Sequence, residues 1–347
     1  MLDYQKIFEL PVFGMKRDEK DAFFRSALSE LTDHHRDNCE AYRRITDVAG
    51  RDSPLPVRLF KEYELLSVPR EAVIKTMTSS GTTGQAVSRI FLDRDTSARQ
   101  SKALSKIVSQ FIGKTRLPML IVDSPAVLKD RNMFSARGAG ILGFSMLGRD
   151  LTWALDENME PDMTIIDNFS KKHEGENVLL FGFTFMIWQH FIQALVSREE
   201  TLAFEGILVH GGGWKKMADQ SVDNERFKQT VRDVTGIGRV CNYYGMVEQT
   251  GSIFMECEQG HLHASVFSDI RILDGQNFAP VEQKRGLIEC ASLLPTSYPG
   301  HRLLTEDEGE LLGVDDCPCG RAGKYFRVYG RVKGAEIRGC SDTYERR

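Results

Sequence analysis

Four short apolar runs that alternate with helical stretches constrain the fold of this 347-residue sequence more than any other feature. The runs are rich in Val, Ile and Leu, as strands covered on both faces tend to be. The alternation predicts an α/β fold with a mostly parallel sheet flanked by helices. The runs are PMLIVD (118–123), VLLFGF (178–183), GILVH (206–210) and GRVCN (238–242), and the helical stretches are 96–112, 184–199 and 217–234.

The parts of the chain on either side of these runs have different patterns. Residues 19–46 repeat apolar residues at three- and four-residue spacing among charges, which indicates amphipathic helices, and His34 and His35 are expected to be solvated there. From residue 252 onward, short alternating runs separated by Gly, Pro and Asp favour an antiparallel, barrel-like region. We therefore predict three parts: a helical lead-in with an α/β core (1–250), a β-rich subdomain (251–333) and a short tail (334–347).

Composition and charge exclude several classes of protein. With a net charge of −4 and a pI near 6.1, the chain has no global basic field to hold nucleic acid, and no nucleic-acid partner is expected. No window reaches the ~18 apolar residues of a membrane span, and the first residues lack the pattern of a secretory signal. The seven cysteines are odd in number and unevenly spread, which suits a reducing compartment, so a cytoplasmic location is expected.

The most informative motif is a loop rich in glycine and hydroxyl side chains, TSSGTTG at residues 78–84. Glycines let the backbone curl, and inward-facing hydroxyl and amide donors suit the oxygens of a polyphosphate. The loop is not a Walker loop, because the G-x-x-x-x-G-K-[ST] spacing is absent. Taken alone it is also compatible with an ordinary polar turn, so its companions decide the interpretation.

The loop closely resembles the signature phosphate loop of the adenylate-forming (ANL) superfamily, whose members activate carboxylic acids with ATP. Three further segments follow in that superfamily's order: HGGGWKK (210–216), NYYGMVE (242–248), and TED (305–307) paired with GRVK (330–333). These ordered matches extend over most of the chain. The resemblance implies the fold of the superfamily's N-terminal domain, ATP and Mg²⁺ as cofactors, and an acyl-adenylate as the activated product.

The resemblance also implies a role for each matching residue. Tyr244 would stack on adenine, Glu248 would hold Mg²⁺ and Asp307 would bind the ribose, which suits π contact and the usual carboxylate–magnesium arrangement. The implied nucleotide-binding residues are Thr78, Ser79, Ser80, Gly81, Thr82, Thr83, Gly84, Gly211, Gly212, Gly213, Tyr243, Tyr244, Gly245, Asp307 and Arg331.

Three lysines are candidates for positive charge facing the reacting phosphates. Lys75 precedes the loop, and Lys215 and Lys216 follow the glycine-rich segment. Such charge would stabilise the pentacovalent phosphate and the departing pyrophosphate. We take Lys215 as the catalytic candidate, with a solvated loop lysine as the alternative interpretation of each.

The tail departs from typical superfamily members, which continue past the GRVK segment into a mobile C-terminal domain. Here the sequence reaches Arg347, and we expect that lid domain to be absent. This truncation, the HGGGWKK segment and PLPVRLFK (54–61) resemble acyl-protein synthetases of the LuxE type, in which a fatty acyl group passes from the adenylate to a cysteine near the C-terminus. The resemblance implies that role for Cys340, and a thiolate is a good nucleophile toward a mixed anhydride. The alternative is an ordinary cysteine in a frayed terminus.

A second set of residues has the chemistry of a structural zinc site. Cys317 and Cys319 form a C-x-C pair, and Cys257 precedes His261 and His263 earlier in the chain. Three thiolates and one imidazole make a tetrahedral Cys₃His set, with His263 preferred to His261. Phenylacetate-activating relatives in the superfamily have similar segments. A metal held there would stabilise the β-rich region without entering catalysis, because all four coordination positions would be filled.

The sequence thus predicts a ligase that activates an apolar carboxylic acid, a fatty acid by resemblance, and transfers the acyl group to Cys340. The final acceptor would be a protein or small molecule, such as a reductase or a carrier. The aromatic segment 181–191 (FGFTFMIWQHF) fits core packing and, in the family, borders the acyl pocket. Two alternatives stay open: an acyl-CoA ligase of the phenylacetate type that works with a separate lid protein, and a non-catalytic acyl- or nucleotide-binding subunit.

Overall fold

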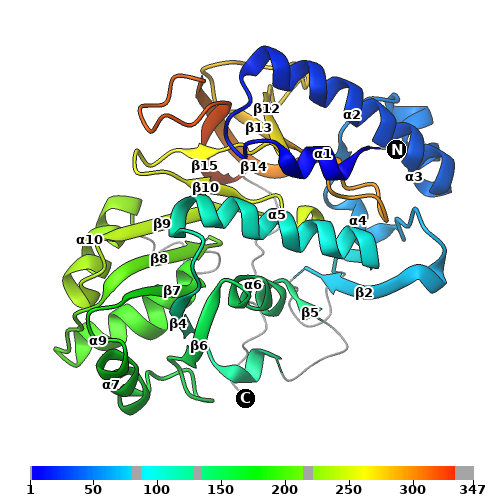
Figure 1. The fold of residues 1–347 in the computed structure, drawn as a ribbon. Coiled ribbons are helices and arrows are strands. Elements are labelled where there is room, and N and C mark those ends of the chain that lie inside the picture. Colours follow the sequence, from blue (N-terminus) through cyan, green and yellow to red (C-terminus); the bar gives the residue numbers. More distant parts are fainter. Residues whose placement is uncertain (1, 80–86, 129–133, 214–221, 333–347) are drawn as a thin grey trace. The chain divides into compact units, whose positions relative to one another are not determined.

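The computed structural model describes residues 2–79, 87–128, 134–213 and 222–332 (Figure 1). Contacts divide these residues into two compact units. The first unit combines residues 2–79 and 87–107 with residues 244–332, and the second contains the described residues from 108 to 243. The helical lead-in therefore belongs to the same unit as the β-rich region. The predicted tail, 334–347, lies outside the described residues.

A parallel sheet forms the centre of the second unit. Its strand order is β9-β8-β7-β4-β6, and each neighbouring pair is parallel (Figure 1). The predicted strand runs are confirmed as β4, β7, β8 and β9. The edge strand β6 escaped prediction because most of its side chains are exposed or half-buried, so it lacks an apolar run. The bounds are β4 (Leu117–Val122), β6 (Gly148–Trp153), β7 (Asn177–Phe183), β8 (Glu205–Gly211) and β9 (Arg239–Tyr244).

Helices connect these strands, and their ends follow local sequence rules. Asp162 and Asp223 precede two of the helices, and each carboxylate accepts a hydrogen bond from a backbone amide of the first turn. Gly236 ends the last helix in the left-handed conformation that glycine adopts without steric cost. The elements are η2 (Pro125–Leu128), β5 (Phe134–Ser135), α6 (Ala136–Ser145), α7 (Met163–Lys172), α8 (Thr184–Met186), the π-helix η3 (Ile187–Ile192), α9 (Gln193–Ser197) and α10 (Asn224–Thr235).

The first unit is built around antiparallel strands in the order β12-β13-β14-β15-β11-β10, with the short β1 parallel to β14. This confirms the antiparallel region predicted after residue 252. Its core contains Phe254, Ile270, Ile288 and Phe326. The bounds are β1 (Leu55–Pro56), β10 (Phe254–Glu256), β11 (Leu262–His263), β12 (Ser268–Leu273), β13 (Gly286–Ser292), β14 (Arg302–Val314) and β15 (Lys324–Arg331), and the turn η5 is Val247–Gln249.

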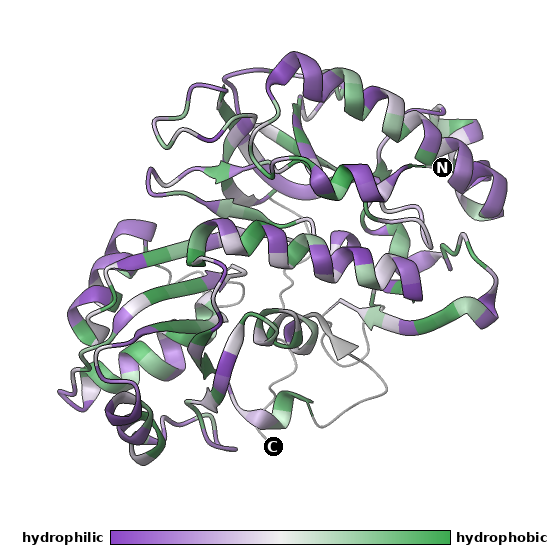
Figure 2. Cartoon of the chain, viewed as in Figure 1, coloured by the Kyte–Doolittle hydropathy of each residue, from purple (hydrophilic) through white to green (hydrophobic). Residues whose placement is uncertain are grey.

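The N-terminal part of the first unit is mainly helical, as predicted for residues 19–46. Hydrophobic and hydrophilic residues alternate along α2 in Figure 2, whereas hydrophobic residues predominate in β7 of the other unit. Among the described helices, none combines the length and apolar character that a bilayer crossing requires. The elements are α1 (Tyr4–Glu9), α2 (Arg17–Asn38), α3 (Glu40–Ala49), α4 (Leu59–Glu62), η1 (Arg70–Ala72), β2 (Val73–Thr78), β3 (Arg89–Asp93) and α5 (Arg94–Ile112), the last of which continues into the second unit.

The expectation that His34 and His35 are solvated is wrong. His35 is fully buried, and its ring stacks on that of His301 at 4.8 Å between centroids. The ring of His34 is partly buried, and its Nε2 lies 2.8 Å from the Thr296 carbonyl oxygen. Both imidazoles on α2 therefore face the segment before β14, a contact made across more than 250 residues of sequence.

Candidate functional site

The predicted phosphate loop emerges from a hairpin of the first unit. Strands β2 and β3 are antiparallel, with Thr78 opposite Arg89. Just beyond the last pair, the Ser79 amide donates to the Ser88 carbonyl oxygen at 3.1 Å, and the Ser88 amide donates to Ser79 Oγ at 2.9 Å. These two bonds close the base of the loop. Thr78 is buried, while residues 80–86, which include Ser80, Gly81, Thr82, Thr83 and Gly84, lie outside the described residues.

Of the three candidate lysines and the candidate acyl acceptor Cys340, only Lys75 lies among the described residues. Lys75 lies on β2 of the hairpin, and partial burial lowers the pKa of its ammonium group. Lys215, Lys216 and Cys340 lie outside the described residues.

The predicted glycine-rich segment, HGGGWKK (210–216), begins with the last two residues of β8, His210 and Gly211, in the second unit. A Cβ atom at Gly211 would lie 2.4 Å from the ring of Tyr243, so only glycine permits this ring to pack against the strand. Gly212 has a φ of +83°, in the region that glycine favours, and Gly213 has open space around its Cα. The Phe144 ring in turn packs against the Tyr243 ring, at 5.2 Å between centroids.

A buried threonine and histidine hold the start of the same segment. Thr184 Oγ1 donates its single proton to the Gly211 carbonyl oxygen at 3.2 Å, so it accepts the bond from His210 Nδ1 at 2.9 Å. This arrangement assigns His210 the neutral tautomer with the proton on Nδ1. Burial lowers the pKa of His210 to about 3, so the imidazole stays neutral at physiological pH. Sequence reasoning missed this pair, because Thr184 belongs to a segment that reads as apolar core.

The next two predicted residues are joined within the first unit. The Tyr244 hydroxyl donates to Asp307 Oδ2 at 2.7 Å, across 63 positions of sequence. Burial, followed by the negative charge of Asp307, raises the pKa of Tyr244 well above its ordinary value, so the phenol keeps its proton. Arg331 pairs with Asp307 in the β14–β15 register, and its Nε lies 3.8 Å from Asp307 Oδ1. The structure thus brings Tyr244, Asp307 and Arg331 together.

Glu248 follows on the three-residue turn η5, two residues beyond Met246. Its side chain is largely buried, whereas Gly245 is exposed. A single carboxylate is enough for Mg²⁺, which takes its remaining ligands from substrate phosphates and water. Glu248 therefore has the donor chemistry for the metal that the sequence predicts, and it stands near Tyr244 in the chain.

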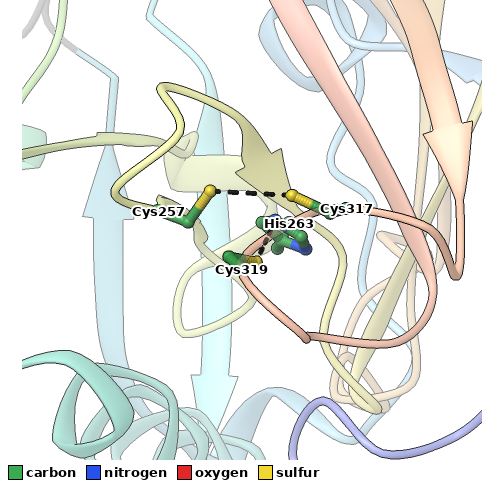
Figure 3. Close-up of side chains that lie close together, drawn as sticks. All are labelled: Cys257, His263, Cys317 and Cys319. Carbon is green, nitrogen blue, oxygen red and sulfur yellow. Dashed lines mark hydrogen bonds between the residues drawn. The ribbon is translucent and has the colours of Figure 1, made fainter.

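The four predicted zinc ligands lie close together in the first unit (Figure 3). Cys257 follows β10, His263 ends β11, and Cys317 and Cys319 lie in the turn between β14 and β15. Their ligand atoms all lie within 4.8 Å of one another. His261 is not in this group, although its Nδ1 lies 3.3 Å from Cys317 Sγ.

The distances in this cluster fit a tetrahedral metal site. With Zn–S of ~2.3 Å and Zn–N of ~2.0 Å, ligand atoms of a tetrahedron stand about 3.5–3.8 Å apart. Cys257 Sγ and Cys317 Sγ are 4.0 Å apart, and Cys319 Sγ is 3.3 Å from His263 Nε2. Burial and the neighbouring thiols raise the pKa of Cys317 to about 12, so these thiols cannot all ionise at neutral pH unless a cation neutralises them.

The aromatic segment after residue 180 packs in the interior of the second unit, as predicted. Phe181 and Phe191 are fully buried, and the Phe144 ring stacks on Phe181 at 4.1 Å between centroids. A Cβ at Gly140 would lie 2.9 Å from Phe183, so α6 approaches this ring closely. These contacts account for the aromatic residues as core packing.

Comparison with known proteins extends these observations. The sequence matches the family described as acyl-protein synthetase, LuxE, over residues 3–347. Two curated relatives carry the name long-chain-fatty-acid–luciferin-component ligase. The one from Vibrio harveyi is 23% identical over 330 residues, covering 89% of this chain and 83% of the relative. The one from Aliivibrio fischeri is 23% identical over 194 residues, covering 54% of this chain and 50% of the relative.

Solved structures show the same fold. A 2-hydroxyisobutyryl-CoA ligase in complex with R3-HIB-AMP superimposes with a TM-score of 0.70 at 18% identity, over 92% of this chain and 69% of that one. The amide bond synthetase McbA from Marinactinospora thermotolerans gives a TM-score of 0.50 at 14% identity, over 81% and 51%. With the family match covering nearly the whole sequence, the chain belongs to the LuxE acyl-protein synthetase family of adenylate-forming ligases.

Proposed function

We propose that this protein activates a fatty acid with ATP and then carries the acyl group on Cys340 before passing it to an acceptor. One observation carries the nucleotide part of the proposal: Tyr244 and Asp307, which the superfamily resemblance assigns to the same nucleotide, are hydrogen-bonded to each other. Two residues 63 positions apart meet in this way only through the fold. The family match over residues 3–347 supports the remainder.

The first reaction is an in-line displacement at the α-phosphorus of ATP. A carboxylate oxygen of the fatty acid forms a bond to phosphorus, and the bond to the β-phosphate bridging oxygen breaks. Pyrophosphate leaves with the electron pair of that bond, and the acyl-adenylate remains. Positive charge from Lys215 would stabilise the pentacovalent phosphorus and the leaving group.

The described residues would hold the nucleotide for this reaction. The Tyr244 ring is suited to stacking on adenine, and its hydroxyl fixes one oxygen of Asp307, leaving the other for a ribose hydroxyl. Glu248 would provide the protein ligand of Mg²⁺, which neutralises charge on the phosphates when bound. The Ser79–Ser88 bonds hold the ends of the phosphate loop.

The second reaction transfers the acyl group to sulfur. The Cys340 thiolate attacks the acyl carbonyl of the mixed anhydride, the carbon–oxygen bond to phosphate breaks, and AMP leaves, so that a thioester remains on the enzyme. Arg338, two residues earlier, would favour the thiolate by its charge. An acceptor nucleophile, on a protein such as a reductase or carrier or on a small molecule, then takes the acyl group and regenerates the thiol.

The substrate class follows from the relatives. Both curated relatives are named as ligases of a long-chain fatty acid and a luciferin component. A long-chain acid is therefore the first substrate to test. The luciferin component in those names belongs to the relatives. For this chain we propose only that the acceptor is a nucleophile able to take an acyl group.

A structural zinc ion at Cys257, His263, Cys317 and Cys319 is part of the same proposal. Support comes from the donor set and from spacings close to those of a tetrahedron. The ion would join the segment after β10 to the turn between β14 and β15. It would stabilise the first unit and take no part in either reaction.

Intact-protein mass spectrometry tests the function directly. The protein is incubated with ATP, Mg²⁺ and carboxylic acids from acetate to long-chain fatty acids, with phenylacetate as an aromatic acid. We expect an acyl adduct that hydroxylamine removes, as it removes a thioester. In Cys340→Ser the adduct should vanish while pyrophosphate release continues. Cys241→Ser, a partly buried cysteine on β9, is the matched control and should keep the adduct.

Other outcomes separate the alternatives. An adduct that persists in Cys340→Ser would place the acyl group on another residue and refute the proposed acceptor. Pyrophosphate release without any adduct would show that the reaction stops at the adenylate, and added coenzyme A would then test direct transfer to an external thiol. The absence of both, with every acid, would contradict the proposed reaction.

A further inference from the structure

The turn that carries Glu248 is held by a segment that no motif marks, residues 295–302 (PTSYPGHR). The turn η5 is a single 3₁₀ turn of three residues, and no side chain caps its start. A turn this short has little rigidity of its own. The position of the Glu248 carboxylate therefore depends on what packs against its backbone.

Tyr298 supplies the most direct contact with that backbone. Its hydroxyl donates to the Glu248 carbonyl oxygen at 2.9 Å and accepts a bond from Gln100 Nε2 at 3.1 Å. The side chain is fully buried, and the ring of Phe60 meets it edge-on at 6.1 Å between centroids. Because burial raises the pKa of the Tyr298 phenol, the hydroxyl remains a donor.

Further contacts fix the same turn, from this segment and from β13. Gln249 Nε2 donates to the carbonyl oxygens of Gly300 at 2.8 Å and of Cys290 at 3.2 Å. A Cβ at Gly300 would lie 2.8 Å from the Glu248 carbonyl oxygen and 2.3 Å from the Tyr298 ring. Only glycine lets the segment approach the turn this closely. The turn and the segment therefore hold each other in one arrangement.

We propose that Tyr298 is a positioning residue for the metal-binding carboxylate: by anchoring the Glu248 backbone, it sets where that carboxylate can meet Mg²⁺ and the phosphates of ATP. The inference rests on the proposed role of Glu248. Residues that orient a metal ligand from outside the coordination sphere typically change metal affinity by about 10–100-fold when substituted. Tyr298 acts through the backbone of one turn, so we expect a change of about tenfold, at the lower end of that range.

Metal binding in the presence of a nucleotide tests the proposal without turnover. Mn²⁺ binding to the full chain is followed by electron paramagnetic resonance with α,β-methylene-ATP, whose α–β linkage cannot release pyrophosphate. Tyr298→Phe keeps the ring and removes the donor, and it should raise the Mn²⁺ dissociation constant about tenfold. The Mg²⁺ concentration for half-maximal pyrophosphate release should rise equally, with the maximal rate recovered at high Mg²⁺.

Tyr4→Phe is the matched control, because the Tyr4 hydroxyl also donates to a backbone carbonyl, that of Leu293, at 2.7 Å in the same unit. It should leave metal binding unchanged. Gly300→Ala is a second variant that keeps every hydrogen-bonding group. Its Cβ would displace both the Tyr298 ring and the Glu248 carbonyl oxygen, so it disturbs the same turn by a different route.

Glu248→Gln in the same titrations separates the two proposals. If Glu248→Gln weakens Mn²⁺ binding while Tyr298→Phe and Gly300→Ala match the wild type, the positioning role of Tyr298 is refuted and the role of Glu248 stands. If Glu248→Gln also leaves binding unchanged, both roles are refuted. The inference is supported if Mn²⁺ binding is weakened both by Glu248→Gln and by the variants Tyr298→Phe and Gly300→Ala, while Tyr4→Phe binds Mn²⁺ as the wild type does.

Discussion

Replacing His301 by glutamine should flatten the acid dependence of stability, because the buried imidazole cannot accept a proton in the fold. Thr32 Oγ1 donates to the Leu28 carbonyl oxygen at 2.8 Å, so it accepts from His301 Nε2 at 3.0 Å. His301 Nδ1 has no hydrogen-bond partner among the described residues. Protonation would place a charged N–H at this buried position, beside the stacked ring of His35 and the charge of Arg302.

The size of the effect follows from the pKa. Burial, with a smaller contribution from Arg302, lowers the pKa of His301 to about 3 from an ordinary value of 6.5. Above pH 6.5 both the folded and the unfolded chain hold the imidazole neutral. As the pH falls below 6.5, only the unfolded chain binds the proton, so stability declines down to about pH 3. Between about pH 7 and pH 5 the loss is about 2 kcal/mol for this one group.

Urea unfolding at several pH values measures this loss. His301→Gln can still donate to Thr32 but does not titrate, so its free energy of unfolding should fall by about 2 kcal/mol less than that of the wild type over the interval. Thr32→Val removes the hydrogen bond alone and should lower stability by a similar amount at every pH. Parallel pH curves for the wild type and His301→Gln would refute the assignment of a neutral, buried imidazole.

Three other predictions follow from the remaining polar contacts. Cys317→Ser, or a strong chelator, should release one zinc ion per chain and lower the midpoint of thermal unfolding by about 5 °C or more. A metal-free protein with an unchanged midpoint would contradict the zinc proposal. Tyr244→Phe should raise KM for ATP about tenfold, because it removes the hydrogen bond that holds Asp307, the proposed ligand of the ribose hydroxyls. KM for 2′-deoxy- or 3′-deoxy-ATP, which lacks one of those hydroxyls, should change less. Equal changes for all three nucleotides would argue that Tyr244 does not act through Asp307. Thr184→Val removes the hydroxyl that donates to the Gly211 carbonyl oxygen and accepts from His210 Nδ1, so it should lower the unfolding free energy by about 1–3 kcal/mol in urea titrations. An unchanged value would show that these two hydrogen bonds add nothing to stability.

The elements that were predictable from sequence are those whose signal is local. Strand runs such as 178–183 can be recognised from their composition. Both faces of β7 are covered, so nearly all of its residues are buried and apolar residues follow one another without interruption. The cysteines and His263 were predictable as a set because few residue types bind zinc, so chemistry limits the choices. The loop and the Tyr244, Glu248 and Asp307 motifs could be found before the fold was known because they resemble, in order, the signature segments of the adenylate-forming superfamily.

What escaped prediction depends on contacts between distant parts of the chain. Nothing near His35 in the sequence indicates that Ser67 and the Pro295 carbonyl meet its two ring nitrogens. Tyr298 likewise sits in a segment without a motif, and its significance comes from the carbonyl oxygen of Glu248, 50 positions earlier. Burial of a polar side chain is decided by its partners, and a single sequence does not name them.

The order in which the two units are encoded has a consequence during synthesis. The described residues from 108 to 243 form the second unit, whereas the first unit needs residue 2 and residue 332 together. At about 5–20 residues per second, roughly 5–20 s pass between the synthesis of residue 243 and that of residue 332. For the first part of that time, α2 lacks the 295–302 segment that contacts His34 and His35, because this segment is synthesised only after residue 294. The apolar face of α2 therefore waits for its packing partners, whereas all the strands of the second unit's sheet are synthesised by residue 244.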